Sequence, residues 1–144
     1  MSMSFKYQND YDKLSNTCPP DEYIAKIIEP AYRWVFDSID DKNNFTPQFH
    51  KKPIRFLNND DLTKCKSMGL SFFNDLKGSI ERFNELKDNL GDNIYAILGV
   101  KIAKGKIDTS DGVNSDFERL GHFTHHPSTT ANYPYSFTLS DTQL

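Results

Sequence analysis

Alternating apolar and polar positions predict several short strands. In residues 32–37 an aromatic side chain stands at every second position, and this period of two favours a strand over a helix. The run NIYAILGVKI, residues 93–102, is apolar on both faces and predicts a central strand in which Gly99 marks a bulge or a close approach. The other predicted strands are residues 54–57, 70–73, a short strand around Ile107, and residues 117–124 and 133–137.

Helical periodicity is clearest in residues 74–90, where Asn74 can cap the helix and Gly91 can end it. A second helix is predicted to begin at the prolines 19–20, because proline suits the first turn and the two following carboxylates complement the helix dipole. A brief third helix is predicted within residues 58–68. The apolar stripe of the long helix is Leu76, Ile80, Phe83 and Leu90.

Together these elements predict one α+β domain. Helices and strands are interleaved unevenly, which indicates α+β and not a doubly wound parallel sheet. We expect residues 1–144 to form a single domain whose mixed, mainly antiparallel sheet packs against two or three helices. Residues 1–17 are predicted to be an N-terminal arm that becomes ordered by docking, and residues 138–144 a polar tail.

Composition excludes several classes of protein. Lys and Arg number 17 against 20 Asp and Glu, and the net charge of −3 gives no overall attraction to nucleic acid or to an anionic membrane. No apolar run approaches the roughly 20 residues that span a bilayer, and residues 1–10 lack the pattern of a signal peptide. We therefore expect a cytoplasmic protein. Cys18 and Cys65 lie far apart without CxxC spacing, and we interpret them as free thiols.

Three of the four histidines lie within the stretch LGHFTHHPS. Side chains alternate along a strand, so His122 and His125 point to opposite sides and the three histidines cannot share a face unless the chain turns. A zinc site would need a ligand such as His50, Cys65 or Asp116 from elsewhere. We therefore expect no metal site and interpret these histidines as strand-end residues, with His122 as a hydrogen-bonding or acid–base residue in a cleft.

The segment GLSFFNDLKGSIERF suggests a ligand-binding shelf. A strand that ends in a small hydroxyl and aromatic side chains precedes a helix, so Ser71 can bond a ligand while Phe72 or Phe73 stacks on a ring. At least one of the two phenylalanines must belong to the core, because neighbours on a strand face opposite sides.

The element order also resembles a known family. The strand with YRW at 32–34, the strand GLSFF, the following helix and NIYAILGV resemble the order in ADP-ribosyltransferase-like and RES-like domains, which bind NAD. In those families an arginine or histidine on an early strand holds the dinucleotide, and a serine or aromatic on the next motif strand supports the nicotinamide side. The resemblance implies Arg33 for the first role, or Arg55 if the early strand is a different one, and Ser71 with Phe72 for the second.

Catalytic residues follow from the same resemblance. The family's glutamate lies on a late strand, and Glu118 in DFERLGHF is the nearest carboxylate, although the motif around it differs. Transfer from NAD passes through an oxocarbenium-like state that a carboxylate stabilises while an arginine binds the pyrophosphate. The resemblance thus implies an NAD- or nucleotide-using transferase or glycohydrolase of the toxin or effector type, with Glu118 and His122 as catalytic residues and NAD as substrate.

The alternative is a non-catalytic interaction module or a small subunit of a larger assembly. The chain has seven tyrosines, eleven phenylalanines and one tryptophan, and aromatic side chains dominate protein interfaces as well as cores. A protein partner would then bind through the aromatic N-terminal arm. One local basic run, HKKPIR, can contact phosphate, but such runs also form solvated loops.

Overall fold

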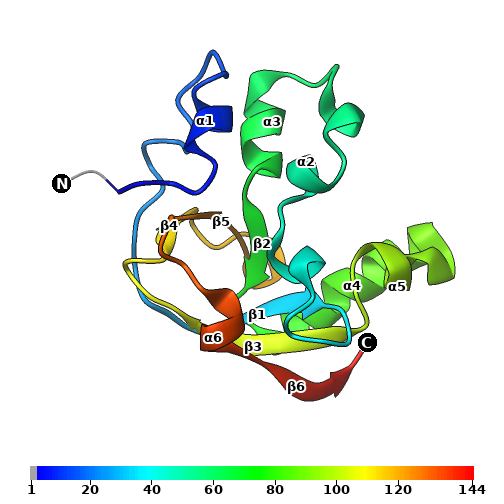
Figure 1. Ribbon diagram of the computed structural model, residues 1–144. Helices are drawn as coiled ribbons and strands as arrows, with labels where there is room; N and C mark the ends of the chain where they lie inside the picture. Colours follow the sequence, from blue (N-terminus) through cyan, green and yellow to red (C-terminus); the bar gives the residue numbers. More distant parts are fainter. Residues whose placement is uncertain (1–2) are drawn as a thin grey trace.

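The computed structural model describes residues 3–144, in which a six-stranded sheet has the order β4-β5-β2-β1-β3-β6 (Figure 1). All of its strand pairings are antiparallel, and the predicted α+β class is confirmed. The strands are β1 (Ile28–Val35), β2 (Leu70–Phe73), β3 (Lys101–Ile107), β4 (Gly112–Asn114), β5 (His122–Pro127) and β6 (Phe137–Gln143). The helices are α1 (Gln8–Tyr11), α2 (Gln48–Lys51), α3 (Asp61–Ser67), α4 (Leu76–Leu90), α5 (Ile94–Ile97) and α6 (Tyr133–Ser136). Short 3₁₀ helices are η1 (Lys42–Phe45), η2 (Pro53–Phe56), η3 (Gly91–Asn93) and η4 (Arg119–Gly121).

Both faces of the sheet bury apolar side chains. On one face Phe72 and Phe123 stack with their ring centroids 5.8 Å apart, within the main core. On the other face Phe73 belongs to a smaller core, against which α4 packs. Neighbouring residues of β2 therefore serve opposite sides of the sheet, as the period of a strand requires.

Helix α4 lies close to its predicted position. Its N-cap is Asp75 and not Asn74, because the Asp75 carboxylate accepts a hydrogen bond from the Gly78 N–H at 2.9 Å. Gly91 follows the helix with a φ of 63°, a left-handed conformation that glycine adopts without steric cost. Within residues 3–144 no helix combines the length and the apolar character that crossing a membrane requires.

Gly78 allows α4 to pack directly against the turn that leads into β5. A Cβ atom at this position would lie 1.9 Å from the backbone oxygen of Leu120, which cannot rotate away. We expect Gly78→Ala to force α4 and η4 apart and to lower the free energy of unfolding by about 1–3 kcal/mol, measured by urea denaturation. Lys77→Ala, at the exposed neighbouring position, is the matched control. Equal losses in the two variants would contradict this steric explanation.

Strands β1 and β2 pair at one position, Tyr32 with Phe73, and diverge from there. The Arg33 side chain lies at this opening. Its Nη1 donates to the carbonyl of Ser71 at 2.7 Å and its Nε donates to the carbonyl of Asn44 at 2.6 Å. Through its bond to Ser71 the guanidinium of Arg33, a β1 residue, joins the two strands where their own ladder stops.

The N-terminal arm docks onto α3, beside which α1 lies in Figure 1. Tyr11 is buried and packs with Cys65 and Met68. Cys18, which follows the arm, forms a disulfide with Cys65, so the free-thiol interpretation is wrong. The physical reason is tertiary, because the arm returns to α3 and brings two Cα atoms separated by 47 residues to within 5.8 Å of each other.

Several predicted strands are instead helical. Residues 53–56 form η2, residues 94–97 form α5, and residues 133–136 form α6. Short apolar runs suit strands and buried helices equally well, so periodicity alone cannot decide between them. Of residues 93–102 only the last two belong to a strand, and β5 begins at residue 122 instead of 117.

The remaining differences concern both ends of the chain. Residues 19–27 form no helix, because Ile24 bridges Asn114 of β4 through two backbone hydrogen bonds, and the segment runs on into β1. Residues 138–144, predicted to be a polar tail, belong largely to β6. This strand pairs with β3 at the edge of the sheet, where polar side chains are common because one side of the strand meets solvent.

Candidate functional site

A cavity of about 570 Å³ lies where β1 and β2 separate. Its walls come from six parts of the chain: β1, the loop and short helices after it, β2 with the end of α3, α4, Leu98 after α5, and the segment around η4. Arg33, Ser71, Glu118 and His122, four of the six candidate site residues, all line it. A volume of this size suits a small-molecule ligand.

Ser71, His122 and Glu118 form a chain of hydrogen bonds on one wall of this cavity. The Glu118 Oε1 atom lies 3.3 Å from His122 Nδ1, and His122 Nε2 lies 3.0 Å from Ser71 Oγ. A carboxylate can only accept, so Nδ1 carries the proton, and Nε2 of the neutral ring then accepts from the Ser71 hydroxyl. This is the arrangement in which an oriented histidine activates a hydroxyl group.

Strand register explains how His122 and Ser71 meet. β2 and β5 pair Phe73 with His122 and Ser71 with Thr124, so Ser71 and His122 are diagonal neighbours on the same face. Burial lowers the pKa of His122 below its ordinary 6.5, although the Glu118 carboxylate acts in the opposite direction. The imidazole is therefore neutral at pH 7 and able to accept a proton.

Positive charge surrounds the cavity. The described residues that line it include five cationic side chains and one carboxylate, Glu118. Burial, together with the nearby Arg33 charge, lowers the pKa of Lys51 to about 8. Burial also lowers the pKa of Arg33 to about 10, and its guanidinium stays charged at neutral pH. Like charges held this close favour binding of an anion. The five cations are Arg33, Lys51, Lys66, Arg82 and Arg119.

Two of these cations have a carboxylate partner outside the cavity walls. Glu85 of α4 pairs with Arg82 and with Arg119, which holds the η4 segment against the helix. Lys51 and Lys66 therefore provide the more available charge. Lys51 lies in the basic run HKKPIR, so the sequence carried a signal for it, whereas Lys66, Arg82 and Arg119 had none beyond their charge.

Aromatic side chains line the same cavity, but not all of those expected. Phe72 is fully buried in the main core on the opposite face of the sheet, whereas Phe73 lines the cavity with Trp34 and Phe36. Arg55 lies outside the walls, on η2, with its guanidinium over the ring of Phe56. The aromatic side chains positioned to contact a ligand ring in this cavity are therefore Trp34, Phe36 and Phe73, and not Phe72.

His125 and His126 do not belong to the cavity. His125 is buried, its Nδ1 donates to Asn114 Oδ1 at 2.7 Å, and its Nε2 accepts from the Tyr133 hydroxyl at 2.5 Å. His126 lies on the same face of β5 as His122, two alternations further along the strand, but it is buried beside the disulfide and does not line the cavity. Of the clustered histidines, His122 alone faces the candidate site.

No family model, curated protein or solved structure shows a significant match to this chain.

Proposed function

We propose that this protein is an NAD- or nucleotide-using glycohydrolase or transferase. The observation that carries the proposal is that the Ser71–His122–Glu118 chain and the Arg33 guanidinium line one cationic cavity. A dinucleotide offers what such a cavity can bind, namely phosphate charge for the cations and flat rings for the aromatic side chains.

Arg33 supports binding mainly by its charge and by its position. Two of its N–H groups are already used by backbone carbonyls, which fixes the guanidinium in the opening between β1 and β2. Lys51 and Lys66, which line the cavity and form no ion pair within the part of the chain that the structure describes, can donate ammonium hydrogens to the pyrophosphate. In this assignment Trp34, Phe36 or Phe73 contacts the nicotinamide or adenine ring.

The reaction we propose breaks the bond between C1′ of the ribose and the nicotinamide nitrogen. The electron pair stays on nicotinamide, which leaves as a neutral molecule, and a water molecule adds to C1′. The water passes its proton through the Ser71 hydroxyl to His122 Nε2, while Glu118 holds the imidazole and offsets the charge that develops on it. An acceptor hydroxyl in place of water would make the reaction a transfer.

Nicotinamide release tests this proposal directly. Purified chain is incubated with NAD, and free nicotinamide is followed by proton NMR. We expect release with the wild-type chain and a rate about 10²–10⁴-fold lower for His122→Ala, because that variant removes the proton acceptor. Saturation transfer to the nicotinamide protons should persist in His122→Ala and weaken in Arg33→Lys, since the second variant alters binding and not proton transfer.

Controls separate catalysis from folding. His50→Ala changes a histidine outside the cavity and should leave the rate as in wild type. The rate should fall only below pH 6.5, where His122 becomes protonated, and Glu118→Gln should move this fall to still lower pH because it removes an influence that raises the His122 pKa. Absence of both saturation transfer and release with folded wild-type protein would contradict the proposal.

A second candidate function is that of a protein-interaction module. Ile54, Leu57 and Leu62 are 81%, 66% and 69% exposed, and large apolar side chains exposed this close in sequence are typical of contact surfaces. The aromatic arm is less available for a partner, since Tyr11 is buried and Tyr7 stacks on His50 of the same chain. Capture of a partner that is lost in an Ile54→Ser, Leu62→Ser variant, without any nicotinamide release, would favour this function.

A further inference from the structure

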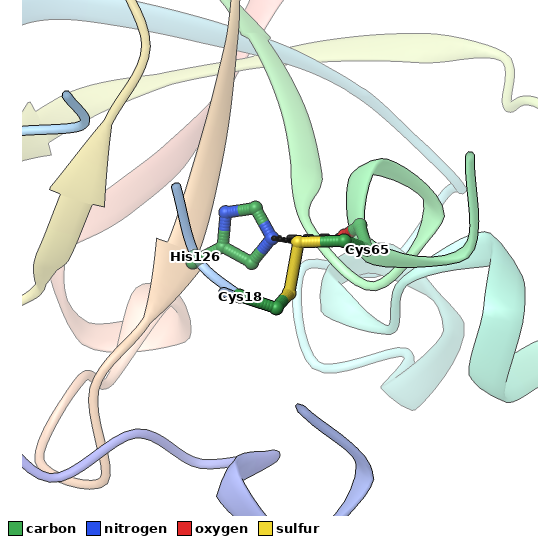
Figure 2. A group of neighbouring side chains, drawn as sticks. All are labelled: Cys18, Cys65 and His126. Atoms are coloured by element: carbon green, nitrogen blue, oxygen red, sulfur yellow. Dashed lines mark hydrogen bonds between the residues drawn. A yellow bond between two sulfur atoms is a disulfide. The ribbon is translucent and has the colours of Figure 1, made fainter. Parts of the chain in front are cut away.

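Cys18, Cys65 and His126 form a second cluster of reactive side chains, outside the cavity (Figure 2). They come from the segment after the arm, from α3 and from β5. The Cys65 Sγ lies 3.9 Å from His126 Nε2, and one ligand atom from each residue lies within 4.8 Å of the other two. All three residues are buried.

Hydrogen bonding around His126 is incomplete. Its Nε2 donates to the carbonyl of Cys65 at 2.9 Å, so the proton is on Nε2 and Nδ1 bears a free lone pair. Nδ1 is buried and has no hydrogen-bond partner among residues 3–144, and the same holds for the hydroxyl of Tyr11, whose ring meets His126 at a centroid distance of 5.4 Å. A buried polar atom without a partner is rare and needs an explanation.

We propose that the reduced form of this cluster binds one zinc-class divalent cation through Cys18, Cys65 and His126. A dithiol reductant gives two electrons and two protons to the disulfide, producing two thiols, and is itself oxidised to a disulfide. The cation then displaces both thiol protons and binds the two thiolates and the imidazole, leaving a fourth position for water. For His126 to bind through Nε2, its proton moves to Nδ1, the atom that lacks a partner in the disulfide form.

The geometry is close to what a tetrahedral site needs. With Zn–S near 2.3 Å and Zn–N near 2.0–2.1 Å, neighbouring ligand atoms lie roughly 3.5–3.8 Å apart. The separation of 3.9 Å between Cys65 Sγ and His126 Nε2 needs only a small adjustment. The two sulfur atoms, bonded to each other in the disulfide, have to move apart to roughly 3.8 Å once the bond is reduced. In a reducing environment such cysteine pairs are kept as thiols and more often bind metals than form structural disulfides. This inference does not depend on the proposed enzymatic function.

Cobalt is the probe that tests it. The chain is reduced with dithiothreitol, freed of reductant under argon and titrated with Co²⁺ while absorbance and circular dichroism are recorded. We expect one Co²⁺ per chain, with the near-ultraviolet thiolate-to-cobalt band and visible bands of a tetrahedral site, and displacement by Zn²⁺. Disulfide-bonded wild type, which has the same sequence, should show no thiolate band. His126→Ala should bind at least tenfold more weakly, whereas His50→Ala should bind like wild type.

The remaining outcomes of the titration each decide for or against the proposal. A reduced chain with no thiolate band overturns it, whether the chain is folded or is unfolded and fails to refold on adding metal. Equal affinity in His126→Ala and wild type would also overturn it, because two thiolates alone would then account for binding. Refolding of a reduced, unfolded chain by Co²⁺ or Zn²⁺ would support it, since ligation and folding are coupled in small metal sites.

Discussion

Loss of the Cys18–Cys65 disulfide is expected to lower the free energy of unfolding by about 4 kcal/mol in metal-free buffer. The bond closes a loop of 47 residues, and in the chain-entropy description a loop of this length restricts the unfolded chain by about that amount. The loss is large against the 5–15 kcal/mol that typically stabilises a domain. Urea denaturation of the oxidised chain and of Cys18→Ala measures it.

A comparison of variants isolates the cross-link from local packing. Cys18→Ala, Cys65→Ala and the double variant all lack the bond, so chain entropy predicts nearly the same loss in each. Cys65 is 2% exposed and Cys18 9%, so any additional packing loss should be small and larger at Cys65. A loss below about 1 kcal/mol in Cys18→Ala would show that the arm is held by its apolar contacts and not by the bond.

This disulfide illustrates what the sequence alone could not show. Neither cysteine lies in a spacing motif, and their pairing depends on the arm folding back onto α3. Such an approach is set by the whole fold, whereas composition and spacing carry only local information. The free-thiol interpretation is wrong because the decisive contact joins residues that are 47 positions apart.

Elements with a local signal were predicted well. β2 has the predicted bounds of residues 70–73, and α4 follows the predicted helix closely because its apolar period and Gly91 are local signals, although its cap is Asp75 and not Asn74. Residues 94–97 and 133–136 were predicted as strands because their apolar side chains suit either structure. There the packing of the surrounding domain, and not the local pattern, selects a helix.

Part of the candidate site could be predicted, because the alternation of side chains along a strand is a local property. Strand parity placed His122 apart from His125, and it required one of Phe72 and Phe73 to be in the core, without showing which. The register between β2 and β5, which brings Ser71 to His122, has no local signature. The split between β1 and β2, where Arg33 bonds the carbonyls of Asn44 and Ser71, likewise has no local signature, so the sequence alone does not predict the cavity.

Acid is expected to destabilise the disulfide-bonded, metal-free protein strongly. Burial lowers the pKa of His125 to about 3 and that of His126 to about 4, whereas both titrate near 6.5 in the unfolded chain. Between pH 6.5 and about 4 the unfolded chain thus binds two protons that the folded chain does not, and stability falls as pH falls through this window. From pH 7.5 to pH 5 these two histidines should remove about 4 kcal/mol of unfolding free energy, since each contributes about 1.4 kcal/mol per pH unit.

Urea denaturation across this pH range, with chelator present, measures the effect, and His126→Asn separates the histidines from other groups. That variant should lose about half of the pH dependence whatever its stability at pH 7.5, because only His125 then remains. In the folded wild type the ring protons of both residues should show no NMR titration above pH 5. Titration near pH 6.5 in the folded state would mean that both imidazoles are protonated as easily in the folded chain as in the unfolded chain. The expected loss of stability in acid would then be absent. The reason to expect otherwise lies in the contacts of His125, which already donates to Asn114 and accepts from Tyr133, so a second ring proton would replace an accepted hydrogen bond in a site closed to water.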